Sequence, residues 1–306
     1  MLWGYIQSFI TIFLGIFIEA VPFLLAGAVV SGLISEYVTP TWLQRVAPRR
    51  PLGAAMSGVA LGMAFPVCEC GVVPVTRRLY KKGLPVSTGV AFLLGAPVLN
   101  PIVIVSTLSA YGWSPMFWGR MGAAFIIALI VGALFHLAEP AMMLQADSDP
   151  HHEVVSAPTA SFSTVIAPST GRRRFWLAMA SAGDEFLEMA QFLAIGCFLA
   201  AGMQVLIPQS ALMVWGNHPV YSVVAMMTLA FVLSICSTVD AFVSLAFVTT
   251  FMPGAVFAFL VFGPMVDIKN LVLFRQVYRP RAVAYLIVLP LLFTAVFAIA
   301  HNVWGG

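Results

Sequence analysis

Two short motifs combine cysteine with carboxylate and hydroxyl groups. Soft thiolates select soft, thiophilic species. Two cysteines one residue apart point about 200° away from each other on a regular helix, but adjacent turn positions can aim both sulfurs at one ion. We therefore expect both motifs to bind a substrate or ion, with Cys68, Glu69 and Cys70 contributing from the first and Cys236, Ser237, Thr238 and Asp240 from the second.

Two other interpretations of the cysteines remain open. Buried cysteines often serve only as small packing residues, and this is our expectation for Cys197, which lies in an apolar stretch. A dithiol oxidoreductase is the second alternative, although such enzymes mostly use the spacing Cys-x-x-Cys, whereas Cys68 and Cys70 are spaced Cys-x-Cys. Because the four cysteines do not form a spaced extracellular framework, we predict free thiols rather than disulfides.

Further carboxylates lie within apolar stretches, where a charge is costly unless it is paired or hydrated. Glu19 and Glu188 belong to this group. Such carboxylates are typical of proton or cation coupling, because a change of protonation alters the cost of exposing the site to either side. We predict coupling roles for both residues, and the alternative is that either one caps a half-helix or pairs with Lys269.

Asn100 and Asp267 occupy equivalent positions, each just past a break that contains glycine and proline. A polar side chain in that position can coordinate a solute together with freed backbone carbonyls, as in discontinuous transporter helices. We therefore include both residues in the predicted substrate site. Helix capping alone is the competing account.

The composition indicates which elements must position these residues. Of the 306 residues, 61% are hydrophobic and 9% are charged, against about 25% charged in an ordinary soluble domain. Apolar segments recur at about the 20 residues that a helix needs to cross a bilayer, without the alternation of membrane barrels. We predict an all-α polytopic membrane protein with eight apolar segments, near residues 5–38, 52–76, 84–109, 115–138, 175–207, 219–250, 252–274 and 282–304.

The two halves of the chain resemble each other. Cys68 aligns with Cys236 and Asn100 with Asp267, and all matching blocks keep an offset of 167 to 169 residues. Such a constant offset indicates an internal duplication. We predict a first membrane repeat at 1–138, a flexible cytoplasmic linker at 139–174 and a second membrane repeat at 175–306.

Basic residues favour one topology for these repeats. If the segments that hold Cys68 and Cys236 enter the membrane and return to the same face, the basic loop residues fall on one side, with Arg120 as the exception. Eight plain crossings, the alternative, divide them between both faces. We predict two inverted repeats, each with three full spans and one re-entrant or broken-helix hairpin. Arg49, Lys81, Arg173 and Arg279 then face the cytoplasm, and His218 faces outward.

Familiar catalytic motifs are missing from the sequence. It contains no phosphate-binding loop, no His-Glu-x-x-His and no Gly-x-Ser-x-Gly. We therefore predict that the chain is not an enzyme and needs no cofactor. The net charge of +3 is accounted for by basic loops, so no nucleic-acid partner is implied.

The motifs together resemble a known family. Cys68-Glu69-Cys70-Gly71, the segment from Val73 to Gly83, Asn100-Pro101 and the run from Cys236 to Phe242 are similar to a bacterial family of predicted permeases related to the organoarsenical efflux permeases. The resemblance spans nearly the whole chain. It implies a permease in the bacterial inner membrane and, more weakly, a trivalent arsenical as the substrate.

These observations predict a membrane permease that moves a small solute, such as a soft thiophilic species, through a midplane site between two repeats. A membrane thiol oxidoreductase or metal-handling protein that uses the Cys-Glu-Cys motif is the alternative. A scaffold for a partner subunit is a third hypothesis. The expected partners are the solute or ion, the lipid bilayer, and either further copies of the chain or a partner subunit.

Overall fold

The computed structural model describes residues 2–37, 48, 50–65, 67–137, 143–145, 171–206 and 218–304. Within these ranges the chain is helical and contains no strand; one isolated bridge joins Leu144 to Tyr278. The predicted all-α fold class is therefore confirmed for the described residues. Most of the predicted linker lies outside them, and the helix that follows it begins at Gly171, before the predicted boundary.

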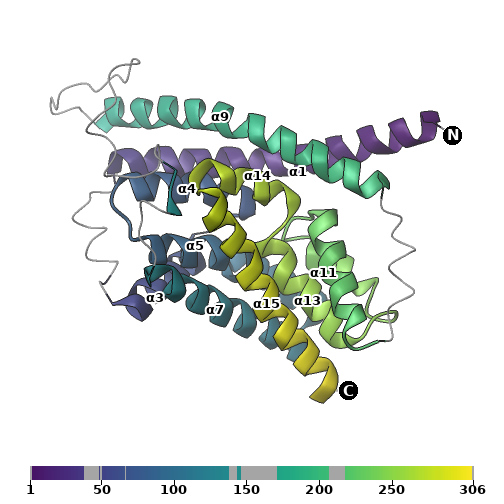
Figure 1. Ribbon diagram of the computed structural model, residues 1–306. Helices are drawn as coiled ribbons and strands as arrows, with labels where there is room; N and C mark the ends of the chain where they lie inside the picture. Colours follow the sequence, from purple (N-terminus) through teal and green to yellow (C-terminus); the bar gives the residue numbers. More distant parts are fainter. Residues whose placement is uncertain are drawn as a thin grey trace.

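Each half of the chain presents the same order of helices. The first half contains α1 (Leu2–Tyr37), α3 (Pro51–Ala64), α4 (Glu69–Lys81), α5 (Val86–Leu99), α6 (Pro101–Tyr111), α7 (Pro115–Leu134) and the short η1 (Phe135–Leu137). The second half contains α9 (Gly171–Leu206), α11 (Tyr221–Leu233), α12 (Asp240–Leu245), α13 (Pro253–Met265), α14 (Ile268–Val277) and α15 (Pro280–Trp304). Figure 1 shows their arrangement.

Six helical stretches of the described residues are long and apolar enough to cross a membrane, three in each half. Two of these stretches are discontinuous, because α5 and α6 are separated at Asn100, and α13 and α14 at Asp267. The segments predicted at 52–76 and 219–250 are not continuous helices. Each begins with a short apolar helix, α3 or α11, and then breaks before a second helix. The six stretches are Ile6–Ile34, Val86–Tyr111, Pro115–Leu137, Phe175–Val205, Pro253–Val277 and Pro280–Val303.

Helices α3 and α4 form a hairpin, with its bend between the end of α3 at Ala64 and the start of α4 at Glu69. Helix α3 runs in the same direction as α5, since Gly58 lies against Thr88 and Gly62 against Ala96. Helix α4 runs back, so that Tyr80 contacts Gly89 near the start of α5. Both ends of the hairpin therefore lie on the side where α5 begins, and its tip lies partway along α5.

Helices α11 and α12 form a second hairpin that enters from the opposite end. Helix α11 runs along α13, with Ala230 against Gly263. After the bend, α12 and the following turns lead back to the start of α13. That start contacts the C-terminal part of α15, since Asn302 accepts a hydrogen bond from Gly254 at 2.7 Å. By contrast, the end of the first hairpin contacts the residue that follows α14, two positions before α15, through a 2.6 Å hydrogen bond between Tyr80 and Tyr278.

The bend of the second hairpin has an unusual backbone conformation. Ser234 adopts a left-handed conformation (φ 49°), which is costly for a residue other than glycine. Its hydroxyl accepts a hydrogen bond from the backbone N–H of Ile268 at 3.3 Å, in the first turn of α14. The strained bend is therefore fixed against the break between α13 and α14.

The long helices α1 and α9 pack side by side and antiparallel. The rings of Phe9 and Phe198 lie 5.1 Å apart, and Gly32 lies against Ala178. Figure 1 shows the pair along one side of the other helices. Helix α1 crosses α4 where Gly27 contacts Gly71, and a Cβ at Gly27 would overlap the backbone of Gly71. Only glycine permits so close a crossing.

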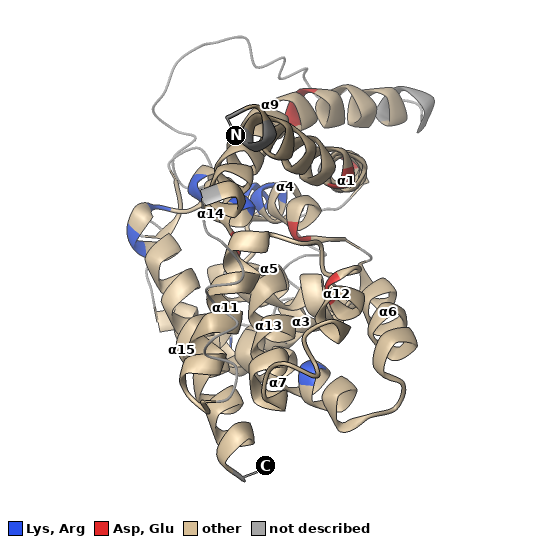
Figure 2. Ribbon diagram, turned by 90° about the vertical axis from the view of Figure 1, so that its right-hand side faces the viewer, with Lys and Arg blue, Asp and Glu red and all other residues tan. Residues whose placement is uncertain are grey.

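Most of the described basic residues gather at the end of the molecule where α4 and α14 end and α15 begins (Figure 2). Arg279 donates a 3.0 Å hydrogen bond to the carbonyl of Leu144, so the short segment after α7 also lies there. His218 lies at the other end, next to Tyr221 in the first turn of α11. Arg120 is not the loop residue that the topology prediction assumes, because it lies inside α7 and is fully buried. Arg49 is outside the described residues.

Candidate functional site

The tips of the two hairpins meet at Glu69, the first residue of α4. One of its carboxylate oxygens lies 3.8 Å from the Sγ of Cys236 and accepts a hydrogen bond from the hydroxyl of Ser237 at 3.5 Å. All three side chains are buried. The two motifs predicted from the sequence to act together are therefore in contact through this carboxylate.

Lys269 of α14 lies beside Glu69 and is only 2% exposed. Its Nζ is 3.6 Å from a carboxylate oxygen of Glu69 and 3.5 Å from one of Asp267. Within a membrane protein, a buried lysine at such a position needs carboxylate partners to offset its desolvation. Lys269 thus links the tip of the first hairpin to the break between α13 and α14.

Asn100 and Asp267 both cap a helix at the site. The side-chain oxygen of Asn100 accepts from the N–H of Val103 at 2.9 Å, and that of Asp267 accepts from Asn270 at 2.6 Å. Asn100 also donates to the carbonyl of Val67 at 3.2 Å, which holds the first hairpin tip to the α5–α6 break. Both residues therefore cap a helix, and Asp267 also forms an ion pair with Lys269.

The cysteines are all buried and unpaired by disulfides. Cys68 precedes α4 as its N-cap, and the thiol of Cys70 interacts with that of Cys68. The hydroxyl of Thr238 lies 3.6 Å from the Sγ of Cys236. No group of three histidine, cysteine or carboxylate side chains within the described residues is arranged to hold a metal ion. Cys68 and Cys70 therefore lie near each other, Cys236 meets Glu69, which lies between them in sequence, and none of the described thiols belongs to a ready metal site.

Asp240 belongs to a buried ion pair, and its backbone N–H donates to the carbonyl of Cys236 at 3.0 Å. The guanidinium of Arg120 donates to its carboxylate at 2.6 Å and to the hydroxyl of Thr107 at 2.9 Å. Arg120 is fully buried, and Asp240 is the first residue of α12. This pair joins the second hairpin to α7.

The two predicted coupling carboxylates lie in different surroundings. Glu19 of α1 is half-buried, with one carboxylate oxygen that is buried and has no hydrogen-bond partner. It interacts electrostatically with Lys269 and Glu69. Glu188 instead pairs with Arg77 at 2.8 Å, two helical turns along α4 from Glu69. The structure therefore brings Glu19 to the hairpin tips and places Glu188 elsewhere.

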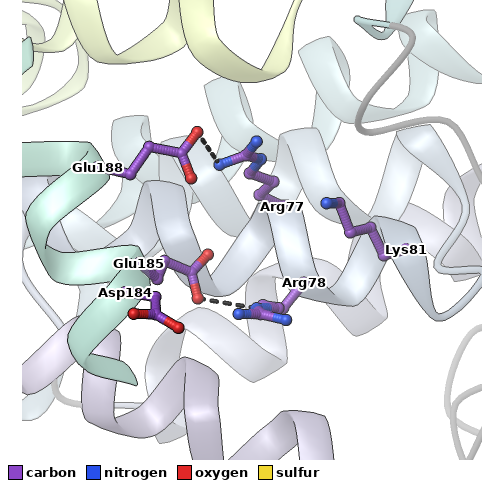
Figure 3. Close-up of a pocket in the computed structure, with 6 residues that line it drawn as sticks. All are labelled: Arg77, Arg78, Lys81, Asp184, Glu185 and Glu188. Carbon is purple, nitrogen blue, oxygen red and sulfur yellow. Dashed lines mark hydrogen bonds and ion pairs between the residues drawn. The ribbon is translucent and has the colours of Figure 1, made fainter. Parts of the chain in front are cut away.

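Glu188 belongs to a cavity of about 200 Å³ between α4 and α9, at the basic end (Figure 3). A second ion pair in this cavity joins Arg78 to Glu185 at 2.8 Å. Glu185 is buried and also accepts a hydrogen bond from Ser31 of α1 at 2.6 Å. The cavity lining consists of Arg77, Arg78, Lys81, Asp184, Glu185 and Glu188.

Sequence reasoning missed Arg120 as a member of the charged network, and it considered Lys269 only as an alternative partner of Glu19 or Glu188, not as a residue of the site. Both are basic residues inside predicted apolar segments. A charge within an apolar membrane segment is costly whatever its sign, so the rule that identified the buried carboxylates applies equally to basic side chains. Applied to both signs of charge, the rule identifies Lys269 and Arg120 as buried charges.

The comparisons with known proteins agree with this architecture. A family model described as predicted permease matches residues 5–303. The UPF0718 protein YcgR of Bacillus subtilis is 41% identical over 279 residues, which is 90% of this chain and 91% of the relative. A Streptococcus mutans protein, provisionally named as a subunit of a two-component membrane permease complex, is 37% identical over 274 residues, 89% of this chain and 87% of its own.

A more distant relative is the UPF0718 protein YraQ of Escherichia coli, 25% identical over 108 residues, 35% of this chain and 31% of the relative. No solved structure gives a significant match. The family match and the six apolar helices together describe a multi-pass membrane protein. The chain belongs to the predicted permease family.

Proposed function

We propose that the chain moves a small solute across the bacterial inner membrane through the buried site at the hairpin tips. The observation that carries this proposal is the contact between Glu69 of one hairpin and Cys236 of the other, which enter from opposite ends. Broken helices and buried charges at membrane depth are typical of transporter binding sites, because such groups are tolerated only where they are buried in protein or line a wet cavity.

Inverted repeats with re-entrant hairpins are part of this proposal. Helices α1 and α9 correspond in the two halves and run antiparallel, as helices related by an in-plane twofold axis must. Helix α3 has 14 residues, which span about 20 Å, less than the hydrocarbon core of about 30 Å. A hairpin that enters and returns suits this length better than two crossings.

The proposed solute is a soft, thiophilic species. Cys68, Cys70 and Cys236 supply sulfur near the tips, and Glu69 and Asp267 supply oxygen. Sulfur ligands favour soft ions and trivalent arsenicals over hard ions. Because no metal-binding group is preformed among the described residues, binding a solute requires the tips to rearrange.

That rearrangement is the proposed transport step. Opening the basic end would separate α9 from α4, which the Arg77–Glu188 and Arg78–Glu185 ion pairs hold together. We propose that these two pairs form a gate at that end. Glu19, which interacts electrostatically with Lys269, is the proposed coupling carboxylate at the site itself. Glu188 would contribute to coupling through its ion pair with Arg77 in the gate.

Transport can be tested with purified protein in liposomes. A trivalent methylated arsenical and Zn²⁺ serve as probes, and entry is compared with protein-free vesicles. Flux above that leak, lost in Glu69→Gln, supports the proposal. Thiol oxidation or reduction without flux of either probe would contradict it and favour the oxidoreductase alternative.

We also propose that the chain works with a partner subunit in the membrane. The provisional name of the Streptococcus mutans relative describes such a complex. Affinity purification from native membranes at mild detergent concentration tests this. Recovery of a second, different membrane protein at a constant ratio to this chain supports a partner subunit. Recovery of copies of this chain alone would contradict the proposal.

A further inference from the structure

Lys269 occupies the position that a bound cation would take. Its ammonium is the only group within the described residues that forms an ion pair with both Glu69 and Asp267. It also interacts electrostatically with the thiols of Cys70 and Cys236. One positive charge therefore stands at the centre of the carboxylates and thiols that could act as ligands.

The surrounding groups carry more negative charge than this ammonium offsets. Glu69 and Asp267 are 2% and 1% exposed, so bulk water does not hydrate either carboxylate. The carboxylate oxygen of Asp267 that faces Lys269 is buried and has no hydrogen-bond partner. Glu19 adds a third carboxylate in electrostatic contact with Lys269. Such a cluster has an unmet capacity for positive charge.

The position of Lys269 makes its displacement consequential. The residue belongs to α14, and its partner Glu69 belongs to the first hairpin, so the ammonium holds the two halves together. Helix α9 passes directly over it, since a Cβ at Gly196 would lie 3.0 Å from the Cα of Lys269. If the ammonium leaves Glu69, the contact between the hairpin tip and α14 is lost.

Glu69, Asp267 and Cys236 do not form a ready metal site while the Lys269 ammonium lies beside them. We propose that they close into a cation-binding site when this tethered ammonium is displaced, and that the transported solute binds as a cation in its place. The inference rests on the proposed function of the same site and names the charge of its substrate. Carboxylate oxygen together with sulfur suits a borderline-soft cation such as Zn²⁺, and disfavours Mg²⁺.

Equilibrium binding of Zn²⁺ to the purified full-length protein, followed by calorimetry in detergent, tests the site without requiring transport. Lys269→Gln removes the competing charge and is expected to bind Zn²⁺ at least about tenfold more tightly than the natural chain. Lys269→Arg keeps a charge there and is expected to bind as weakly as the natural chain. Arg275→Gln, an exposed position on the same helix, is the matched control and is expected to change nothing.

Two double variants separate the loss of the ammonium from a change in net charge. Lys269→Gln with Asp184→Asn, an exposed carboxylate outside the proposed site, removes one charge of each sign, leaves the net charge unchanged, and is expected to keep the gain. Lys269→Gln with Glu69→Gln is expected to lose the gain in Zn²⁺ affinity, because Glu69 is one of the proposed ligands. Two results would overturn the inference. One is that Lys269→Gln binds Zn²⁺ no more tightly than the natural chain, and the other is that Lys269→Arg gains as much Zn²⁺ affinity as Lys269→Gln. Absence of flux in liposomes, with the binding gain intact, would count against the proposed function alone.

Discussion

The guanidinium of Arg120 lies 2.6 Å from a carboxylate oxygen of Asp240, and both side chains are buried. Arg120 belongs to α7 of the first half and Asp240 to α12 of the second. The ion pair therefore ties the second hairpin to a helix of the other half. Since this hairpin carries Cys236 to the site, the pair positions the site without contacting Glu69.

The first prediction concerns the stability of this pair. Arg120→Met leaves the Asp240 carboxylate buried without its partner, which is expected to cost about 3 to 5 kcal/mol. Thermal unfolding in detergent measures the loss. Arg120→Met combined with Asp240→Leu replaces both charges by apolar groups and is expected to recover most of the stability, because no unpaired charge remains. A double variant as unstable as the single one would show that the pair contributes more than charge balance.

The second prediction concerns the crossing of α1 and α4. Gly27→Ala places a Cβ against the backbone of Gly71, so the helices must separate. We expect a loss of stability of about 1 to 3 kcal/mol, as for other overpacked contacts. Gly15→Ala, on the same helix with no atom near the added Cβ, is expected to be neutral or to stabilise by up to about 1 kcal/mol. Equal melting temperatures for the two variants would mean that α1 does not approach α4 as described.

The third prediction concerns the thiols. Cys68→Ser with Cys70→Ser is expected to abolish flux of the arsenical and Zn²⁺ probes in liposomes, and Cys236→Ser to reduce it, because a hydroxyl is a poor ligand for soft species. Cys197→Ser is expected to have little effect, since Cys197 packs within α9. Normal flux in the double variant would mean that Cys68 and Cys70 serve only as packing residues. Monodispersity on size exclusion confirms that each variant is folded.

The fourth prediction concerns topology. Cysteines introduced at Lys81 and Arg279, both exposed at the basic end, are expected to react with an impermeant thiol reagent only from the cytoplasmic side. A cysteine at His218 is expected to react only from outside. All three are placed in a chain with its natural cysteines retained, because those are buried. Labelling of positions 81 and 218 from the same side would contradict the inverted topology.

Local patterns in the sequence were enough to predict much of the architecture. Hydropathy indicated the all-α membrane class, because the cost of burying backbone in lipid leaves few alternatives. Proline and glycine marked the breaks before Asn100 and Asp267. These signals depend on neighbouring residues, so a single sequence contains them.

The tertiary structure alone decided how the charges pair. Glu19 and Glu188 occupy equivalent positions in the two halves, yet only Glu19 interacts with Lys269, while Glu188 pairs with Arg77. The sequence contains the charges and the cost of burying them, but not the partner that offsets this cost. That partner depends on which helices cross and at which residues along them. Close contacts such as the one between Gly27 and Gly71 determine these crossings.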